Sequence, residues 1–264
     1  MFPMRFQKFL LALLLPWAGA TLAVAAAPLS SARVTEAKHD VLYKGETAGE
    51  RAAKLDDVVR GADVLRTGER SLAEIEFDDK TITRLGSKSV FSFSAEAREF
   101  NVDKGLALIC MPKGAGGGRI VTAAITAGIE GTTVLVLGTG KIIFLEGFGT
   151  ISTRDGKQSA AIHGGQIALL QNGVLKIYDV LLDPLLKGRF IKGRPQPLPT
   201  WAAITEVNDQ QQDDLKRGKK SVAKGGGAPG KPPDVGDPAY RNEGMIGILL
   251  NGNPAKGGES PFSH

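Results

Sequence analysis

The stretch of residues 65–93 constrains the fold more than any other part of the sequence, because its hydrophobic pattern, turn chemistry and charge agree throughout. At residues 73–77 apolar side chains alternate with glutamates, which is the period of two expected of a half-buried strand. Two aspartates and a lysine interrupt this pattern, and β-branched residues resume it at residues 81–85, which predicts a hairpin. A third short strand follows, with Phe91 and Phe93 on one face. The stretch therefore predicts a β-sheet module.

Short apolar runs separated by glycine-containing turns continue this pattern to residue 178. We expect strands over residues 106–111, 120–137, 141–146, 148–153, 159–163, 166–170 and 174–178. Short strands of even spacing are typical of a sandwich, a barrel or a β-solenoid, so we predict an all-β fold in a β-solenoid-like or sandwich arrangement. The GAGGG run before Arg119 leads into a β-rich segment, which favours a turn over a phosphate loop.

The sequence divides into four segments. Residues 28–54 are a polar lead-in with one strand at 41–43, and residues 55–180 are the β domain. Residues 46–59 suggest a helical turn, although two glycines weaken it, and residues 95–101 suggest a charged connection. Residues 181–264 hold ten of the fourteen prolines, which predicts a largely disordered tail with one short helix at 200–217.

The first 27 residues follow the pattern of a secretory signal peptide, with a positive head, an apolar run and small residues. Cleavage is expected between Ala20 and Ala27. The alternative is a retained anchor, but the uninterrupted apolar core at residues 9–15 is short against the roughly 20 residues that a span requires. We therefore expect a periplasmic or secreted protein whose mature chain has no stable membrane span.

The formal charge of +5 comes from the ends of the chain. From residue 28 to 183 there are 19 Lys and Arg against 20 Asp and Glu, whereas from residue 184 onward there are 12 against 8. A nucleic-acid-binding domain concentrates basic residues on a folded face, so the sequence does not predict a nucleic-acid partner.

A second apolar cluster, MIGILL at residues 245–250, stands in the basic tail. It is equally well interpreted as a docking or partner-binding segment and as a collapsed patch.

The sequence offers no reactive constellation, and we predict a protein that is not an enzyme and holds no cofactor or metal. Cys110 lies in an apolar run, which favours a buried thiol over a nucleophile. Glu74 and Glu76 lie about 7 Å apart on one strand face, a separation that some glycosidases use, but alternating glutamates favour a solvated face. The three histidines stand at no metal-binding spacing: His39, His163 and His264.

The pattern of turns and strands resembles the FecR domain family from about residue 57 to residue 170. The residues that carry the resemblance are Gly61, Asp63, Thr67, Gly68, Asp79, Leu85, Gly86, Ser89, Gly131, Thr132, Glu146 and Gly147. Lys80 departs from the family pattern, which has a glycine in this hairpin. The resemblance implies a free β module of the bacterial envelope, similar to the sensing or protein-binding half of FecR-type regulators, without their cytoplasmic anti-sigma half.

We therefore predict a non-catalytic module that binds an unidentified envelope protein or senses a signal. The candidate partner-binding face consists of Glu74, Glu76, Thr81, Thr83 and Arg84. The alternatives are a carbohydrate or cell-wall binding module and the periplasmic part of a sigma-factor regulatory system. The oligomeric state stays open.

Overall fold

This computed structural model describes residues 28–192 and 198–218. The predicted signal peptide, the predicted disordered tail beyond residue 218 and the apolar cluster at residues 245–250 lie outside the described residues.

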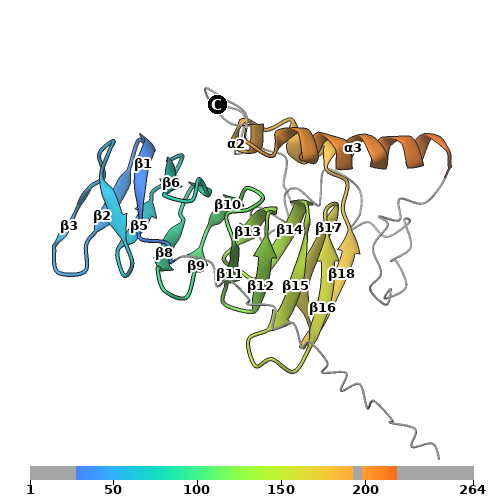
Figure 1. The fold of residues 1–264 in the computed structure, drawn as a ribbon, viewed down its shortest axis with the longest axis horizontal. Helices are drawn as coiled ribbons and strands as arrows, with labels where there is room; N and C mark the ends of the chain where they lie inside the picture. Colours follow the sequence, from blue (N-terminus) through green and yellow to red (C-terminus); the bar gives the residue numbers. More distant parts are fainter. Residues whose placement is uncertain (1–27, 193–197, 219–264) are drawn as a thin grey trace, which may run out of the picture.

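These residues contain eighteen strands in two sheets of nine (Figure 1). Sheet A contains β1 (Ser31–Lys38), β4 (Val58–Arg60), β6 (Leu72–Phe77), β7 (Ile82–Leu85), β10 (Leu106–Cys110), β13 (Thr133–Leu137), β14 (Lys141–Glu146), β17 (Gln166–Gln171) and β18 (Val174–Asp179). Sheet B contains β2 (Val41–Lys44), β3 (Glu50–Ala52), β5 (Val64–Thr67), β8 (Val90–Ser94), β9 (Glu99–Lys104), β11 (Gly117–Val121), β12 (Ile125–Glu130), β15 (Phe148–Thr153) and β16 (Ser159–His163).

The order of the strands in each sheet nearly follows their order in the sequence. Sheet A is ordered β18-β17-β14-β13-β10-β7-β6-β1-β4 and sheet B β16-β15-β12-β11-β9-β8-β5-β2-β3. The chain passes back and forth between the sheets after one or two strands, so both sheets grow in the same direction (Figure 1). Neighbouring strands are antiparallel except for β9 and β11. This arrangement confirms the all-β prediction, because it is a sandwich built by solenoid-like progression.

The main core lies between the two sheets, as the alternating sequence pattern requires. Ile75 and Phe77 of sheet A and Phe91 and Phe100 of sheet B are all at most 1% exposed. The ring of Phe77 meets those of Phe93 and Phe100 edge-on, with centroids 4.9 and 5.4 Å apart. Aromatic side chains from both sheets therefore join the layers near the hairpin that the sequence analysis identified.

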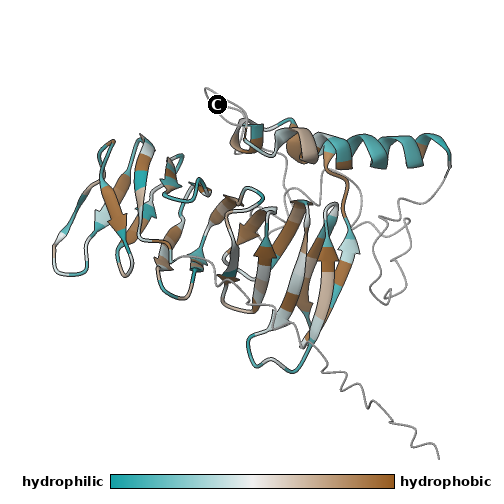
Figure 2. Cartoon of the chain, in the orientation of Figure 1, coloured by the Kyte–Doolittle hydropathy of each residue, from teal (hydrophilic) through white to brown (hydrophobic). Residues whose placement is uncertain are grey.

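A helical layer covers part of the outer face of sheet A (Figure 1). It consists of the short helices α1 (Asp183–Leu186) and α2 (Arg189–Lys192) and the longer α3 (Trp201–Lys216). Leu182, Phe190 and Ile204 pack against outward-facing residues of the sheet such as Leu108 and Ile143. In Figure 2 apolar colour concentrates on the strands, whereas most of α3 is polar. The third layer exists because the middle strands of sheet A are apolar on both faces.

Two expectations about connections are wrong. Residues 46–59 contain strands β3 and β4 rather than a helical turn, and Asp56 between them has φ of 66°. The backbone there bonds to neighbouring strands, since Ala53 N donates to Val41 O and Asp56 N to Val34 O. Residues 95–101 lead into β9 rather than forming only a connection.

Candidate binding surface

Three of the family-pattern residues form a buried hydrogen-bonded node between the sheets. The hydroxyl of Thr67 donates to Gly86 O at 2.5 Å and accepts from Ser89 N at 2.8 Å. The hydroxyl of Ser89 in turn accepts from Leu106 N at 3.0 Å. Because Thr67 ends a strand of sheet B while Gly86 and Leu106 adjoin strands of sheet A, the node fixes the two sheets against each other.

Two aspartates of the pattern hold turns. Asp63 is 5% exposed and accepts hydrogen bonds from Tyr43 OH, Glu46 N and Arg60 N at 2.8, 3.1 and 2.8 Å. Asp79 accepts from Thr81 N at 2.9 Å and pairs with the buried guanidinium of Arg98 at 2.6 Å. These carboxylates are engaged within the chain, which limits their availability to a ligand.

The glycines and Lys80 occupy positions where the backbone turns or approaches another strand. Lys80 stands where the family has glycine and adopts that residue's left-handed conformation, with φ of 69°. Gly61 lies in the turn between β4 and β5. A Cβ at Gly68 would collide with the side chain of Asp40, and one at Gly147 with the hydroxyl of Thr132.

A second cluster lies where α3 begins. Glu146 is 3% exposed, and burial raises the pKa of its carboxyl although hydrogen bonds from Thr133 oppose this. Within the described ranges its Oε1 atom has no hydrogen-bond partner. Thr133 Oγ1 lies 2.6 Å from Thr200 Oγ1, which is also 3.3 Å from Cys110 Sγ. The cluster joins the start of α3 to the outer face of sheet A.

Cys110 and the two described histidines lie on different elements, Cys110 on β10, His163 on β16 and His39 in the bend between β1 and β2. The Cys110 thiol is buried, and desolvation raises its pKa. His39 is exposed with φ of 60°, and His163 Nδ1 lies 2.9 Å from Gly164 O. Within residues 28–192 and 198–218, no three His, Cys, Asp or Glu residues are grouped as metal ligands would be. None of the helices in the same ranges is both long enough and apolar enough to cross a membrane.

The predicted partner-binding face does not form one exposed surface. The register pairs Ile75 with Thr83 and Glu74 with Arg84, so Thr83 shares the core-facing side of Ile75. Thr81 and Thr83 are both 0% exposed. In β7 the side chain of Thr83 therefore points into the core, and those of Ile82 and Arg84 point outward. Polarity alone would have placed the threonine outward and the isoleucine inward.

Arg84 faces outward but is covered by the helical layer. Its guanidinium pairs with Glu74 at 2.5 Å and donates to the carbonyl oxygens of Phe190 and Ile191 at 3.0 and 2.9 Å. The side chains of Arg84 and Glu74 are only 5% and 15% exposed. Of the five predicted residues, Glu76 is the one whose side chain stays substantially accessible, at 38%.

On strands β1 and β6, the outer face of sheet A carries charged side chains, and the helical layer does not cover them. We call this area the charged surface; it consists of Arg33, Glu36, Lys38, Glu76 and Lys80. Lys80 Nζ lies 2.7 Å from Glu76, and Lys38 pairs with Glu36. Sequence reasoning missed the contribution of β1, although the alternation of Ala32 and Val34 with polar residues predicts a strand.

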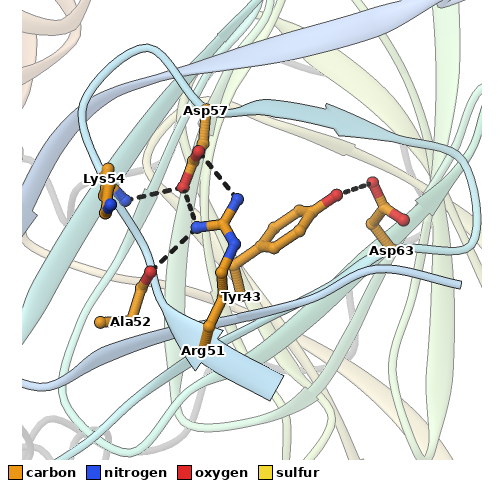
Figure 3. Close-up of polar contacts among 6 residues, drawn as sticks. All are labelled: Tyr43, Arg51, Ala52, Lys54, Asp57 and Asp63. Atoms are coloured by element: carbon orange, nitrogen blue, oxygen red, sulfur yellow. Dashed lines mark hydrogen bonds and ion pairs between the residues drawn. The ribbon is translucent and has the colours of Figure 1, made fainter. Parts of the chain in front are cut away.

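The N-terminal end of the sandwich is closed by a polar network (Figure 3). Arg51 on β3 makes two hydrogen bonds to Asp57, at 2.7 and 2.9 Å, and its guanidinium lies 4.6 Å from the centre of the Tyr43 ring. These contacts lower the pKa of Asp57, chiefly through the hydrogen bonds from Arg51. Tyr43 on β2 also donates to Asp63, so the network joins the edge strand β3 to β2 and to the loops before and after β4 of sheet A.

The fold and these contacts define the chain as an all-β module with hydrogen-bonded turns, a helical cover and one charged outer surface. Residues 63–147 match the model of the family described as FecR protein. The chain is therefore similar to FecR proteins in that stretch, which agrees with the resemblance noted from the sequence.

Two solved structures, each described as a "putative anti-sigma factor" from Parabacteroides distasonis ATCC 8503, resemble the chain. The first is 12% identical with a TM-score of 0.41, and the match covers 47% of this chain and 65% of that one. The second is 11% identical with a TM-score of 0.41, covering 55% of this chain and 72% of that one. This chain thus spans slightly less than two thirds of the first structure. No curated protein matches the sequence.

Proposed function

We propose that this chain is a non-catalytic, exported FecR-domain protein that binds another protein of the bacterial cell envelope, as a protein-binding or signal-sensing module. The observation that carries the proposal is the FecR match at residues 63–147, which coincides with the middle of the sandwich. The signal-like first 27 residues support export.

The charged surface is the proposed contact area. It is built on strands β1 and β6 and the turn after β6, so its shape is fixed by the sheet. Its side chains carry both signs of charge, and they are accessible. The side chains of Lys80, Arg33 and Glu76 are 74%, 60% and 38% exposed. Exposed ion pairs contribute little to the stability of the fold, so their charged side chains are available to a binding partner. A protein with complementary charges would therefore bind here with a strong dependence on salt.

Site-specific crosslinking in cells tests this proposal. A photo-activatable residue at Glu76 should trap a distinct envelope protein, whereas one at the exposed Thr150, on the outer side of sheet B, should not. Charge reversal by Arg33→Glu together with Lys80→Glu should weaken the crosslink at Glu76 about 10-fold or more, as expected when attraction becomes repulsion.

Three outcomes contradict the proposal. Recovery of glycan alone at Glu76 would instead favour the carbohydrate-binding alternative. Equal trapping of the same protein at Thr150 would exclude the charged surface as the contact area. Unchanged trapping by the charge-reversed variant would show that these charges do not recognise the partner.

The second candidate function is the periplasmic part of a sigma-factor regulatory system, which the FecR match favours. It predicts that the trapped protein is a membrane regulator or a receptor. It also predicts that charge reversal changes transcription from a sigma-dependent promoter by the same factor as it changes crosslinking. Crosslinking that is lost while transcription stays constant would contradict this candidate and leave the protein-binding function standing.

A further inference from the structure

The two ends of the sandwich differ in how the last strands of the two sheets are covered and connected. At the N-terminal end, the loop after β3 bonds to both sheets: Ala53 N donates to Val41 O at 2.8 Å and Asp56 N to Val34 O at 2.9 Å. Arg51 closes over Tyr43 at the same end (Figure 3). The last strands of sheets A and B are therefore joined there by backbone and side-chain contacts.

At the other end, sheet A has apolar side chains that are covered only in part. Leu170 pairs with Leu175 and Ala168 with Ile177, so all four share the face toward sheet B. Ala168 is fully buried, but Leu170 is 36% exposed, and Leu175 and Ile177 are only partly buried. We call Leu170, Leu175 and Ile177 the apolar shelf. The side chain of Gln158 bridges to one corner of this end, at Gly173 O and Leu175 N.

The progression of the strands shows where a further strand belongs. The chain places β13 and β14 in sheet A, β15 and β16 in sheet B, and β17 and β18 in sheet A. The next position in this progression is in sheet B beside β16, opposite β18 and over the apolar shelf. Within the described residues β16 has a single neighbouring strand, β15, and the chain after β18 instead enters the helical layer.

We propose that residues 245–250 of the same chain dock beside β16 as an added strand and cover the apolar shelf. This segment reads MIGILL, as long as the six-residue β18 and one residue longer than β16. Ile246, Ile248 and Leu250 alternate along it, so in a strand they share one face and match the three apolar side chains of the shelf. β-branched residues favour that conformation, and main-chain pairing to an open edge supplies binding energy.

The position of α3 brings the tail to this end of the molecule. The helix starts where Thr200 contacts Cys110 and reaches Gln211, which accepts from Leu182 N just after β18. Figure 1 shows α3 extending past β18, and its last residue is Lys216. Met245 lies 27 positions after Gly218, a separation that sets an upper limit of about 90 Å on its reach. The edge of β16 is therefore within reach of the segment.

Amide hydrogen exchange of the full chain tests the docking. Residues 245–250 and the amides of β16 should exchange slowly, with rates that do not depend on protein concentration. Ile248→Asp should accelerate exchange at both places at least ~10-fold, equivalent to about 1.4 kcal/mol of pairing free energy. The matched control Asn251→Asp adds the same charge beside the segment and should leave both rates unchanged. A chain ending at Gly218 should show the same acceleration at β16.

Several results would overturn the inference. Rapid exchange throughout residues 245–250 in the unaltered chain would show that no strand forms. Protection that grows with protein concentration would assign the added strand to a second copy of the chain. Protection of β16 that persists in Ile248→Asp, or in the chain ending at Gly218, would show that the tail does not cover this edge. These results are independent of whether the charged surface binds an envelope protein.

Discussion

The guanidinium of Arg84 connects the β6–β7 hairpin to helix α2, two segments that are distant in sequence. It pairs with Glu74 on β6 and donates to the carbonyl oxygens of Phe190 and Ile191 in α2. Removing it would leave Glu74 Oε2 and two backbone oxygens without this donor where they are mostly buried, while Thr35 would still donate to Glu74 Oε1 at 2.9 Å. Breaking a buried pair in this way costs more than the pair itself contributes, because the remaining charge is uncompensated.

We therefore expect Arg84→Met to lower the free energy of unfolding by about 3–5 kcal/mol. The matched control is Lys80→Met, which removes the exposed partner of Glu76 and should change stability by less than about 1 kcal/mol. Urea unfolding followed by circular dichroism measures both. Equal effects of the two variants would show that Arg84 does not hold the helical layer in place.

Glu146 gives the fold a pH dependence of definite sign. Burial raises its pKa above the ordinary value of 4.5, so the folded state binds this proton more tightly than the unfolded state. Its contribution to stability is fully present below pH 4.5 and is lost as the pH rises through the raised value. Ionisation of this buried carboxyl, whose Oε1 lacks a partner among the described residues, therefore opposes folding.

Replacing Glu146 with Gln should therefore stabilise the protein at pH 7.5 relative to the unaltered chain, by roughly 1–3 kcal/mol. The difference should shrink as the pH is lowered toward 4.5. Glu96→Gln, at an exposed position, serves as the control and should show no such trend. Urea unfolding across this pH range provides the measurement, and a difference that grows on acidification would contradict the assignment.

At the scale of elements, α3 is held by a narrow set of contacts. Ile204 is fully buried against the outer face of sheet A, and Gln211 is 3% exposed between Leu182 N and Val180 O. The other side of the helix is polar, and Leu215 near its end is 45% exposed. The helix therefore depends on its docking face rather than on its own sequence, since most helical stability in proteins comes from tertiary packing of one face.

Ile204→Ala should accordingly destabilise the protein by about 2–5 kcal/mol, the range for truncating a buried aliphatic side chain. Leu215→Ala on the same helix should change stability by no more than about 0.5 kcal/mol. Thermal unfolding of the two variants side by side decides this. If Leu215→Ala is the more damaging change, the packing of α3 on sheet A is not the source of its stability.

The sequence predicts some of these elements better than others, for physical reasons. The hairpin of β6 and β7 is encoded locally, by alternation on both sides of a turn in which Lys80 adopts the conformation of glycine. The burial of Arg84 could not be predicted from the local sequence. The residues that cover its side chain, Phe190 and Ile191, come more than a hundred residues later in the chain. Long-range contacts of this kind leave no periodic signal near either partner.

Strand β9 shows the same limit in another form. Its residues pair in parallel with β11, from Glu99 with Arg119 to Asn101 with Val121, across the glycine-rich turn. Phe100 and Val102 alternate along the strand and are buried, whereas charged residues such as Glu99 and Asp103 face outward. These charges make the apolar alternation difficult to recognise in the sequence. The charged residues at 95–101 favour a connection, and this signal outweighed the alternation of buried and exposed positions that marks the strand.

The molecule as a whole is close to one-dimensional, because each strand pairs with strands that are near it in the progression. The protection of the strands nevertheless differs along its length. In the middle, β10, β13 and β14 are buried on both faces, by sheet B on one side and by the helical layer on the other. At the N-terminal end β3 is exposed throughout, and at the other end β18 is at most partly buried. Local opening requires least free energy where the fewest apolar contacts are lost.

We therefore expect native-state hydrogen exchange to be slowest in β10, β13 and β14 and to accelerate toward both ends. At the N-terminal end, part of the protection should depend on the contacts of Arg51 with Tyr43 and Asp57. Arg51→Ala should accelerate exchange in β2 and β3 while leaving β13 unchanged, since the network touches only that end. Uniform exchange along the chain, or acceleration in β13 equal to that in β2, would show instead that the sandwich opens as one cooperative unit.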